Sequence, residues 1–226
     1  MQITEIYRSI QGESSFAGLP CIFVRLTGCN LRCDWCDSEY TFTGGQRMSL
    51  EEVEAEIAHL LPVKLVEITG GEPMLQEREV VPLMERLLAS GYQILLETSG
   101  ERLLERVPKQ VVKIVDVKCP HSGEGESFRL SNLEALTRQD EIKFVLSNRV
   151  DYEFARDFVH EHALPTRVAN VIFSPAFRKE AQGARDSSHC LLDPQQLAEW
   201  ILEDGLPVRL GLQIHKFIWQ PEMKGV

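Results

Sequence analysis

Short apolar stretches with the length of buried strands alternate along the chain with longer stretches that have the apolar spacing of helices. This alternation predicts βα units and a mostly parallel sheet. About six units are too few for a closed eight-fold barrel, so the expected α/β fold is a partial, open (βα)6 barrel. We expect a single domain over residues 1–226, with a short N-terminal segment and a C-terminal tail. The expected strands are Gln2–Tyr7, Cys21–Leu26, Leu65–Thr69, Gln93–Thr98, Val111–Val117, Glu141–Leu146, Val168–Phe173 and Arg209–Ile214.

Capping residues mark the starts of two expected helices. Ser49 and Glu52 have the spacing of a capping box at the start of a helix that runs to Leu61. Asp193 is expected to cap a helix that has Pro194 at its first position and runs to about Asp204. The other expected elements are a helix over Glu79–Ser90, a helix capped by Asp151 that runs to His162, and a polar loop, Ala176–Leu191, that could act as a lid or an interface.

Composition and charge argue against several classes of partner. The chain has 226 residues, of which 43% are hydrophobic and 26% charged, as is ordinary for a globular protein. A formal net charge of −10 argues against a direct nucleic-acid partner, because phosphate binding needs a basic surface. The chain has no apolar run of about 18 residues that could span a membrane, and its first residues lack the pattern of a signal peptide. We therefore expect a protein of a reducing, cytoplasmic compartment.

Three of the six cysteines lie in one short loop, residues 29–36, which reads CNLRCDWC. Thiolates at Cys29, Cys33 and Cys36 could ligate three irons of a [4Fe–4S] cluster. The fourth iron would then be open to a ligand that carries an amine and a carboxylate, as S-adenosylmethionine (SAM) does. A disulfide set is disfavoured by the odd number of clustered cysteines. A zinc site would need a further cysteine pair, but zinc binding and plain packing both remain open from the spacing alone. The other cysteines, Cys21, Cys119 and Cys190, are scattered.

A second candidate site follows the strand Leu65–Thr69, where residues 69–73 read TGGEP. Two glycines allow the backbone to approach a ligand closely. The exposed carbonyls and Glu72 could accept hydrogen bonds from an ammonium group, although a simple strand-to-helix turn would look the same. Ligands of parallel α/β folds bind at the carboxyl ends of the strands, and the unusual polar residues of this chain gather at those ends.

The cysteine loop and the glycine turn together resemble the radical SAM superfamily, whose signature is Cys-x3-Cys-x-aromatic-Cys. The resemblance implies that Cys29, Cys33 and Cys36 bind a [4Fe–4S] cluster and that the turn holds the amino group of SAM. It also implies the chemistry. The reduced cluster cleaves SAM, and the 5′-deoxyadenosyl radical that results abstracts a hydrogen from the substrate.

Six further segments narrow the resemblance: residues 10–13 (IQGE), 23–31 (FVRLTGCNL), 36–38 (CDS), 97–100 (ETSG), 116–120 (DVKCP) and 213–216 (QIHK). Over essentially its whole length the chain resembles the 7-carboxy-7-deazaguanine synthase family. The resemblance implies a lyase that contracts the ring of 6-carboxy-5,6,7,8-tetrahydropterin, releases ammonia and supplies the queuosine pathway. It also implies an external flavodoxin-like or ferredoxin-like reductant, a homodimer, and SAM that is regenerated after turnover.

The resemblance assigns a role in substrate binding to residues whose chemistry suits a carboxylated pterin. Arg25 offers a bidentate fork for a carboxylate. Gln11 and Glu13 could read the donors and acceptors of the pyrimidine edge. The implied substrate-binding residues are Ile10, Gln11, Gly12, Glu13, Arg25, Thr69 and His215.

The resemblance also assigns residues to SAM and to Mg²⁺. Ser38 corresponds to the position that binds Mg²⁺, a hard ion that prefers oxygen ligands, and the ion is expected to bridge Ser38 and the substrate. Two features depart from the family pattern: His121 stands where a small polar residue is common, and the chain continues beyond Lys216. The implied SAM contacts are Trp35, Cys36, Asp37, Gly71, Lys118, Ser122, Ser174 and Pro175.

Two other functions stay in view. A radical SAM activase that installs a glycyl radical on a partner enzyme would share the cysteine loop, but it would need a protein-docking groove in place of a pterin pocket. A non-catalytic binding module stabilised by zinc would use the cysteines without any cluster.

Overall fold

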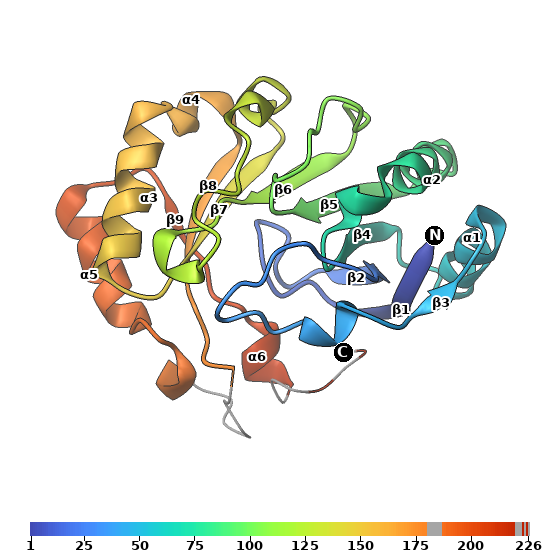
Figure 1. The fold of residues 1–226 in the computed structure, drawn as a ribbon, viewed down its shortest axis with the longest axis horizontal. Helices are drawn as coiled ribbons and strands as arrows, with labels where there is room; N and C mark the ends of the chain where they lie inside the picture. The colour runs from blue at the N-terminus through green and yellow to red at the C-terminus, as the bar shows by residue number, and fades with distance from the viewer. Residues whose placement is uncertain (180–186, 220–222, 224, 226) are drawn as a thin grey trace.

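The computed structural model describes residues 1–179, 187–219, 223 and 225, which form one curved sheet with helices on its outer side (Figure 1). The nine strands follow the order β3-β1-β2-β4-β5-β6-β7-β8-β9. Neighbours from β2 to β9 are parallel, whereas β1 is antiparallel to both β2 and β3. The sheet stays open because β3 and β9 are its two edges, as expected for a partial barrel. The strands are β1 (Gln2–Ile10), β2 (Pro20–Leu26), β3 (Gln46–Arg47), β4 (Leu65–Gly70), β5 (Gln93–Thr98), β6 (Val112–Asp116), β7 (Glu141–Leu146), β8 (Asn170–Pro175) and β9 (Arg209–Leu210).

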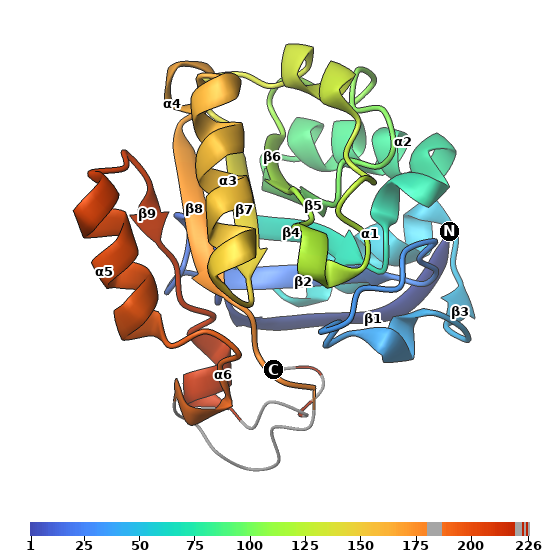
Figure 2. The same ribbon diagram turned by 60° about the vertical axis from the view of Figure 1, so that its left-hand side comes forward.

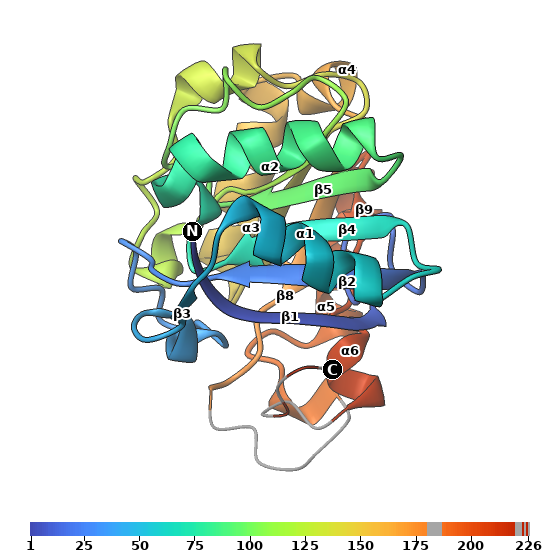
Figure 3. The same ribbon diagram turned by 90° about the vertical axis from the view of Figure 1, so that its right-hand side faces the viewer.

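Helices α1, α2, α3 and α5 lie on the convex face of the sheet, whereas α6 lies at the open side of the barrel, where His215 and Lys216 line the hollow. Helices α3 and α5 lie along β7, β8 and β9 (Figure 2), and α1 and α2 lie beside β1, β2, β4 and β5 (Figure 3). None of the helices in the described part of the chain is long and apolar enough to cross a membrane. The α-helices are α1 (Leu50–His59), α2 (Glu77–Ala89), α3 (Arg149–Glu161), α4 (Leu164–Arg167), α5 (Pro194–Asp204) and α6 (His215–Ile218). The 3₁₀ turns are η1 (Glu39–Thr41), η2 (Pro73–Gln76), η3 (Pro120–Ser122), η4 (Leu130–Glu134) and η5 (Ser187–His189).

Alternation along the parallel strands divides the side chains between two environments. In β4, Val66 and Ile68 join the main apolar core under the helices, whereas Glu67 and Thr69 face the hollow of the sheet. The same division recurs in β5, β6 and β7. A strand in the middle of a sheet is buried on both sides, so a carboxylate or ammonium on its inner face must find a partner or a ligand. This division gathers the polar side chains Glu67, Thr69, Glu97, Asp116 and Lys143 in the hollow.

Two of the predicted helix caps are confirmed and one is wrong. The Ser49 hydroxyl accepts from the amide of Glu52, whose carboxylate accepts from the amide of Ser49, and Asp193 caps α5. The cap of α3 is Asn148, not Asp151. The carboxylate of Asp151 is buried and accepts instead from the Ser147 amide at 3.0 Å and the His121 amide at 3.0 Å. It therefore ties the start of α3 to the loop after β6.

The last strand is shorter than predicted. Parallel pairing ends at Leu210, whereas the apolar pattern predicted a strand through Ile214. The chain then crosses the open edge of the barrel, where the Ile214 amide donates to the carbonyl of Gly12 at 2.9 Å. This crossing brings Gln213 and His215 into the hollow of the sheet.

Two connections of the expected (βα)6 pattern lack an α-helix. Within the described residues, β5 joins β6 through a loop, and β6 joins β7 through the 3₁₀ turns η3 and η4. Asn132, which is buried, holds these loops together: its amide donates to the carbonyls of Gly100 and Arg102 and accepts from the amide of Leu104. One side chain thus satisfies backbone groups that helices would otherwise have paired.

Candidate active site

A cavity of about 510 Å³ opens at the carboxyl ends of the parallel strands. Its walls include Arg25 from β2, Thr69 from β4, Glu97 from β5, Asp116 from β6 and Lys143 from β7. The cysteine loop forms one wall, and the segment that follows β9 forms another. The site therefore lies where parallel α/β folds bind ligands. All seven predicted substrate residues line it, as do Ser38 and the SAM candidates Trp35, Cys36, Asp37, Gly71 and Lys118.

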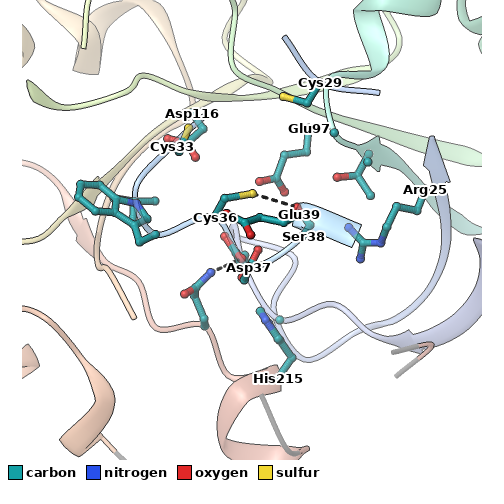
Figure 4. Close-up of a pocket in the computed structure, with 18 of the residues that line it drawn as sticks. Arg25, Cys29, Cys33, Cys36, Asp37, Ser38, Glu39, Glu97, Asp116 and His215 are labelled. Carbon is teal, nitrogen blue, oxygen red and sulfur yellow. Dashed lines mark hydrogen bonds between the residues drawn. The ribbon is translucent and has the colours of Figure 1, made fainter. Parts of the chain in front are cut away.

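Cys29, Cys33 and Cys36 are half-buried free thiols that line the same cavity (Figure 4). Within the described chain, no three His, Cys, Asp or Glu side chains are close enough together to hold a single metal ion. That spacing disfavours a tetrahedral zinc site, in which all donors lie about 2–2.3 Å from one ion. Three thiols spread around one end of a cavity fit the corners of a larger cluster. Burial raises the pKa of Cys33 to about 11, so ionisation of this thiol needs a nearby cation, which cluster irons would supply.

Several hydrogen bonds fix the shape of the cysteine loop. One terminal nitrogen of Arg32 donates to the carbonyls of Cys29 and Leu31 at 2.8 and 2.7 Å, and its guanidinium lies 4.2 Å from the ring centre of Phe42. The Asp34 amide donates to the carbonyl of Ser122 at 2.9 Å. These contacts fix the backbone of the loop that carries the three thiols.

The glycine turn after β4 packs against the start of the cysteine loop. Gly70 has φ +143°, and a Cβ on Gly71 would lie 2.2 Å from the carbonyl oxygen of Gly28. Glu72 differs from expectation, because its buried carboxylate is already engaged by the Met74 and Ser99 amides and the Thr98 and Ser99 hydroxyls. Glu72 therefore holds the turn in shape, and the turn's backbone carbonyls are the groups left for a ligand ammonium.

Replacing Gly71 by alanine tests this close approach. We expect Gly71→Ala to destabilise the fold by about 2–3 kcal/mol and to weaken SAM binding, because a Cβ contact of 2.2 Å forces the turn away from Gly28. Thermal unfolding and SAM equilibrium dialysis measure the two effects. Gly91→Ala is the control: the φ of +77° at Gly91 would strain an alanine, but no atom lies within 4 Å of its added Cβ, so this variant should lose stability without weakening SAM binding. Equal behaviour of the two variants would contradict the proposed packing.

Asp116 and Lys118 form an ion pair on the side of the cavity near Cys33. Lys118 Nζ lies 2.7 Å from Asp116 Oδ2, and this pairing raises the pKa of Lys118 although burial opposes it. The other oxygen, Asp116 Oδ1, is buried and has no hydrogen-bond partner in the described chain. A buried acceptor without a donor is costly, so this oxygen suits a ligand hydroxyl or amine. The ion pair and the unpartnered carboxylate oxygen on this side of the cavity therefore suit a polar cofactor such as SAM.

Arg25 lies at the opposite side of the cavity from Cys33 (Figure 4). Its Nε donates to Glu5 at 2.9 Å and its Nη2 donates to the Tyr7 hydroxyl at 2.8 Å. Glu5 also accepts from the Tyr40 hydroxyl at 2.8 Å. Nη1 of Arg25 has no protein partner within the described residues, so the guanidinium is held from behind and keeps donors for a ligand anion.

Side chains from β7 and from the segment after β9 hold both carboxylate oxygens of Glu13. Lys143 Nζ bridges Glu13 and Glu97, and Gln213 Nε2 donates to Glu13 at 2.7 Å. Burial alone would raise the pKa of Glu13, but the Lys143 ammonium outweighs it and lowers the pKa to about 2. Burial raises the pKa of Glu97. Glu13 is therefore an ionised acceptor at neutral pH.

Gln11 and His215 have supporting contacts that the sequence did not reveal. The Gln11 amide donates to Glu67 and accepts from the Glu13 amide at 2.9 Å, so both its ends are engaged below the cavity. Burial, reinforced by repulsion from Glu97 and Glu13, raises the pKa of Glu67 well above its usual value. His215 packs so closely on residue 12 that a Cβ there would lie 2.0 Å from its Nδ1, which explains why residue 12 is glycine. Burial lowers the pKa of His215, so its imidazole is neutral at pH 7.

Comparisons with known proteins identify the family. The model of the Radical SAM superfamily matches residues 23–120. A protein of Koribacter versatilis (strain Ellin345) named 7-carboxy-7-deazaguanine synthase is 72% identical over 226 residues, which cover 100% of both chains. The chain belongs to the 7-carboxy-7-deazaguanine synthase family.

Other members of the 7-carboxy-7-deazaguanine synthase family agree with this assignment. The synthase of Chlorobaculum tepidum is 38% identical over 229 residues, covering 100% of this chain and 97% of its own. The crystal structure of QueE from Escherichia coli superposes with a TM-score of 0.70 at 25% identity, over 93% of this chain and 92% of that one. The expected radical SAM enzyme class is thereby confirmed, and with it the need for SAM and a [4Fe–4S] cluster. The activase and the zinc module are not favoured.

Three residues that the resemblance assigned to SAM do not line the cavity. The Ser122 hydroxyl is fully buried and donates to the Cys119 carbonyl at 2.6 Å. Ser174 and Pro175 end β8 and are buried. Ser122 instead supports the cysteine loop through its backbone carbonyl, and direct SAM contacts by these three residues stay a prediction.

Sequence reasoning gave no role to several cavity residues. Glu67, Glu97 and Lys143 are charged residues inside otherwise apolar strands, and this was the signal that could have identified them. Gln213 and Lys216 lie in a segment that carried the family resemblance, but no pattern indicated which way they point. The predicted loop Ala176–Leu191 is only partly described: Phe177, Arg178 and Lys179 line the cavity, and residues 180–186 lie outside the described part.

Proposed function

We propose that the chain converts 6-carboxy-5,6,7,8-tetrahydropterin to 7-carboxy-7-deazaguanine with loss of ammonia, supplying the queuosine branch of 7-deazapurine synthesis. One observation carries the proposal: a single cavity joins the three-cysteine loop to Arg25 and Glu13. The names of the relatives support the same reaction. An activase would need an open groove for a protein chain, whereas this cavity has the size and polarity of a small-molecule site.

The substrate end suits a carboxylated pterin. In the proposal, Arg25 donates to the substrate carboxylate, because Glu5 and Tyr7 orient its guanidinium and leave Nη1 available. The ionised Glu13 and neighbouring Glu97 accept from the N–H groups of the pyrimidine edge. Gln11 acts on the substrate through Glu13, whose backbone it holds. Ile10, Gly12, Thr69 and the neutral His215 complete the walls.

The cofactor end would hold the cluster through Cys29, Cys33 and Cys36. Trp35, Asp37, Gly71, Asp116 and Lys118 would then surround SAM, with the unpartnered oxygen of Asp116 as an acceptor for one of its donors. When bound, the cluster and SAM supply the electron and the radical that begin hydrogen abstraction. The chain's own contribution is to orient the two ligands in one cavity and to shield them from water.

Ser38 is proposed as the protein ligand of Mg²⁺. Its hydroxyl lines the cavity and lies 3.7 Å from Cys36 Sγ, between the cysteine loop and the substrate end. Mg²⁺ commonly keeps several waters and takes few protein ligands, so one hydroxyl with a substrate carboxylate is a fitting set. We further propose a cytoplasmic homodimer of single-domain chains, reduced by a flavodoxin-like or ferredoxin-like protein.

A product assay tests the proposed function. Purified protein, reconstituted anaerobically with iron and sulfide, is reduced and incubated with SAM and the carboxytetrahydropterin. We expect formation of 7-carboxy-7-deazaguanine and ammonia, together with visible iron–sulfur absorption. SAM cleavage without any deazaguanine would favour the activase, and a colourless protein with stoichiometric zinc would contradict the cluster.

Neutral substitutions at two carboxylates of the cavity, Glu67 and Glu13, test which of them is ionised. Glu67 has a pKa raised well above its usual value, so Glu67→Gln mimics its neutral state and should change the KM for the pterin by less than about threefold. Glu13→Gln removes an ionised acceptor and leaves Lys143 with one carboxylate fewer, so the KM should rise about 10- to 100-fold. Steady-state kinetics at pH 7 compare the variants. A larger loss in Glu67→Gln than in Glu13→Gln would overturn the assignment.

A further inference from the structure

A continuous chain of side chains connects the substrate end of the cavity to the cysteine loop. Lys143 Nζ contacts both Glu97 and Glu13, and Gln213 Nε2 donates to the other oxygen of Glu13 at 2.7 Å. Lys216 Nζ donates to Gln213 Oε1 at 2.9 Å and to Asp37 Oδ2 at 2.7 Å. Asp37 directly follows the cluster ligand Cys36 in the chain. The two ends of the active site are thus joined through five consecutive contacts.

The donors and acceptors in this series of side chains permit only one orientation of the Gln213 amide. A carboxylate accepts and an ammonium donates, so the Gln213 amide must turn its nitrogen to Glu13 and its oxygen to Lys216. The connecting residues are shielded from water: Lys143, Gln213 and Lys216 expose 3%, 7% and 5% of their surface. Lys216 Nζ also lies 4.7 Å from the centre of the Phe177 ring, which limits where the ammonium can go. Asp37, at the far end, exposes 50% of its side chain, so the shielded part of the connection runs from Lys143 through Gln213 to Lys216.

We propose that Lys216 is a positioning residue that couples pterin binding to SAM binding, by linking Asp37 to Glu13 through Gln213. The inference rests on the proposed function, which assigns the pterin to Glu13 and SAM to the neighbourhood of Asp37. A ligand on Glu13 orders Gln213 and Lys216, and Lys216 then holds Asp37 in the position that SAM needs. The second ligand meets a site that is already ordered, so the coupling is positive. Coupling of this kind is reciprocal, and either ligand strengthens the other by the same factor.

Binding measurements on the holoenzyme test the proposal without turnover. The cluster is reconstituted anaerobically and kept oxidised, and the Kd of SAM is measured by equilibrium dialysis with and without saturating carboxytetrahydropterin. In the unaltered enzyme we expect the pterin to lower the Kd of SAM about tenfold. In Lys216→Met, which keeps the length of the side chain and removes the ammonium, we expect the ratio of the two Kd values to fall to about one.

A second variant and a matched control keep the test decisive. Gln213→Glu keeps an acceptor for Lys216 but replaces the donor to Glu13 by a second carboxylate, so it should abolish the coupling as Lys216→Met does. Lys113→Met removes another buried lysine, which pairs with Asp140 at 3.1 Å away from the cavity. Asp140 retains donors from the Lys113 and Thr137 amides and the Thr137 hydroxyl, so the protein should fold with normal coupling.

The outcomes separate this inference from the proposed function. A ratio near one in the unaltered enzyme, with both ligands bound, would overturn the coupling and leave the function intact. An unchanged ratio in Lys216→Met or Gln213→Glu would overturn the role of the connecting side chains. Failure of the pterin to bind or to be converted would overturn the proposed function, and the coupling with it.

Discussion

Cys33→Ala is expected to abolish cluster assembly and, with it, SAM cleavage and all product formation. The three thiols of the loop are the ligands proposed here for the cluster that the family requires, and each lines the cavity. Within the described chain, the other cysteines, Cys21, Cys119 and Cys190, are buried and do not line the cavity, so none can substitute. Loss of one thiolate from a three-thiolate site leaves two irons without protein ligands. Iron content, visible absorption and the yield of 5′-deoxyadenosine after reduction measure the result.

Cys21→Ala is the matched control for this substitution. Cys21 is fully buried near the start of β2, at the end of that strand away from the cysteine loop, and its thiol donates to the carbonyl of Ile22 at 3.5 Å. Its removal should cost about 1 kcal/mol of stability through lost packing and leave the iron content unchanged. A Cys33→Ala variant that still cleaved SAM would refute the ligand assignment. Equal loss of iron in both variants would show a general defect in folding.

Arg25→Ala should lower kcat/KM for the pterin about 10²- to 10³-fold while sparing the cluster. The guanidinium is half-buried between Glu5 and Tyr7, and removing it deprives a ligand carboxylate of its partner and leaves Glu5 without its cation. A loss of about 3–4 kcal/mol, at the lower end of the cost of breaking a buried charge pair, corresponds to that fold-change. Steady-state kinetics with the pterin, alongside iron content and the Kd of SAM, separate substrate binding from cofactor loading.

Arg25→Lys distinguishes charge from geometry at the same position. An ammonium can keep the ion pair with Glu5, but it cannot donate to Glu5, Tyr7 and a ligand carboxylate in one plane. We expect the Arg25→Lys variant to recover no more than about tenfold of the kcat/KM that is lost in Arg25→Ala. Substrate kinetics equal to the unaltered enzyme in Arg25→Ala would remove Arg25 from the pocket. Full recovery in Arg25→Lys would show that charge alone matters.

Local pattern was sufficient to predict most of the elements and their order. The capping box at Ser49 and the Asp193 cap concern residues a few positions apart, so they can be read from neighbouring letters. The Asp151 cap failed because the helix begins three residues earlier, where Asn148 accepts from the Val150 and Asp151 amides. The Asp151 carboxylate instead accepts from the amide of His121, which is distant in the sequence. The strand expected through Ile214 failed for a similar reason, since the Gly12 carbonyl draws the chain away from β8.

The features of the candidate site also fall into two groups, those that the local sequence predicted and those that only the fold revealed. The three cysteines lie within one loop, so the spacing in the sequence alone pointed to their chemistry. The partners of Lys143 could not be predicted from local sequence, because Glu13 and Glu97 lie 130 and 46 residues away along the chain. Glu72 was expected to face a ligand, and only the packing of β5 beside the turn revealed that Thr98 and Ser99 engage it.

The sequence by itself determined the order of strands and helices, the open parallel sheet and the thiol loop, because each depends on side chains a few residues apart. The tertiary structure decided which charges meet: that Lys143 joins two carboxylates, that Asp116 keeps an unpartnered oxygen, and that Lys216 reaches Asp37. The physical reason is that strand alternation fixes only the face on which a side chain lies. Its neighbours on that face are set by sheet order and by the crossing after β9, which no local pattern encodes.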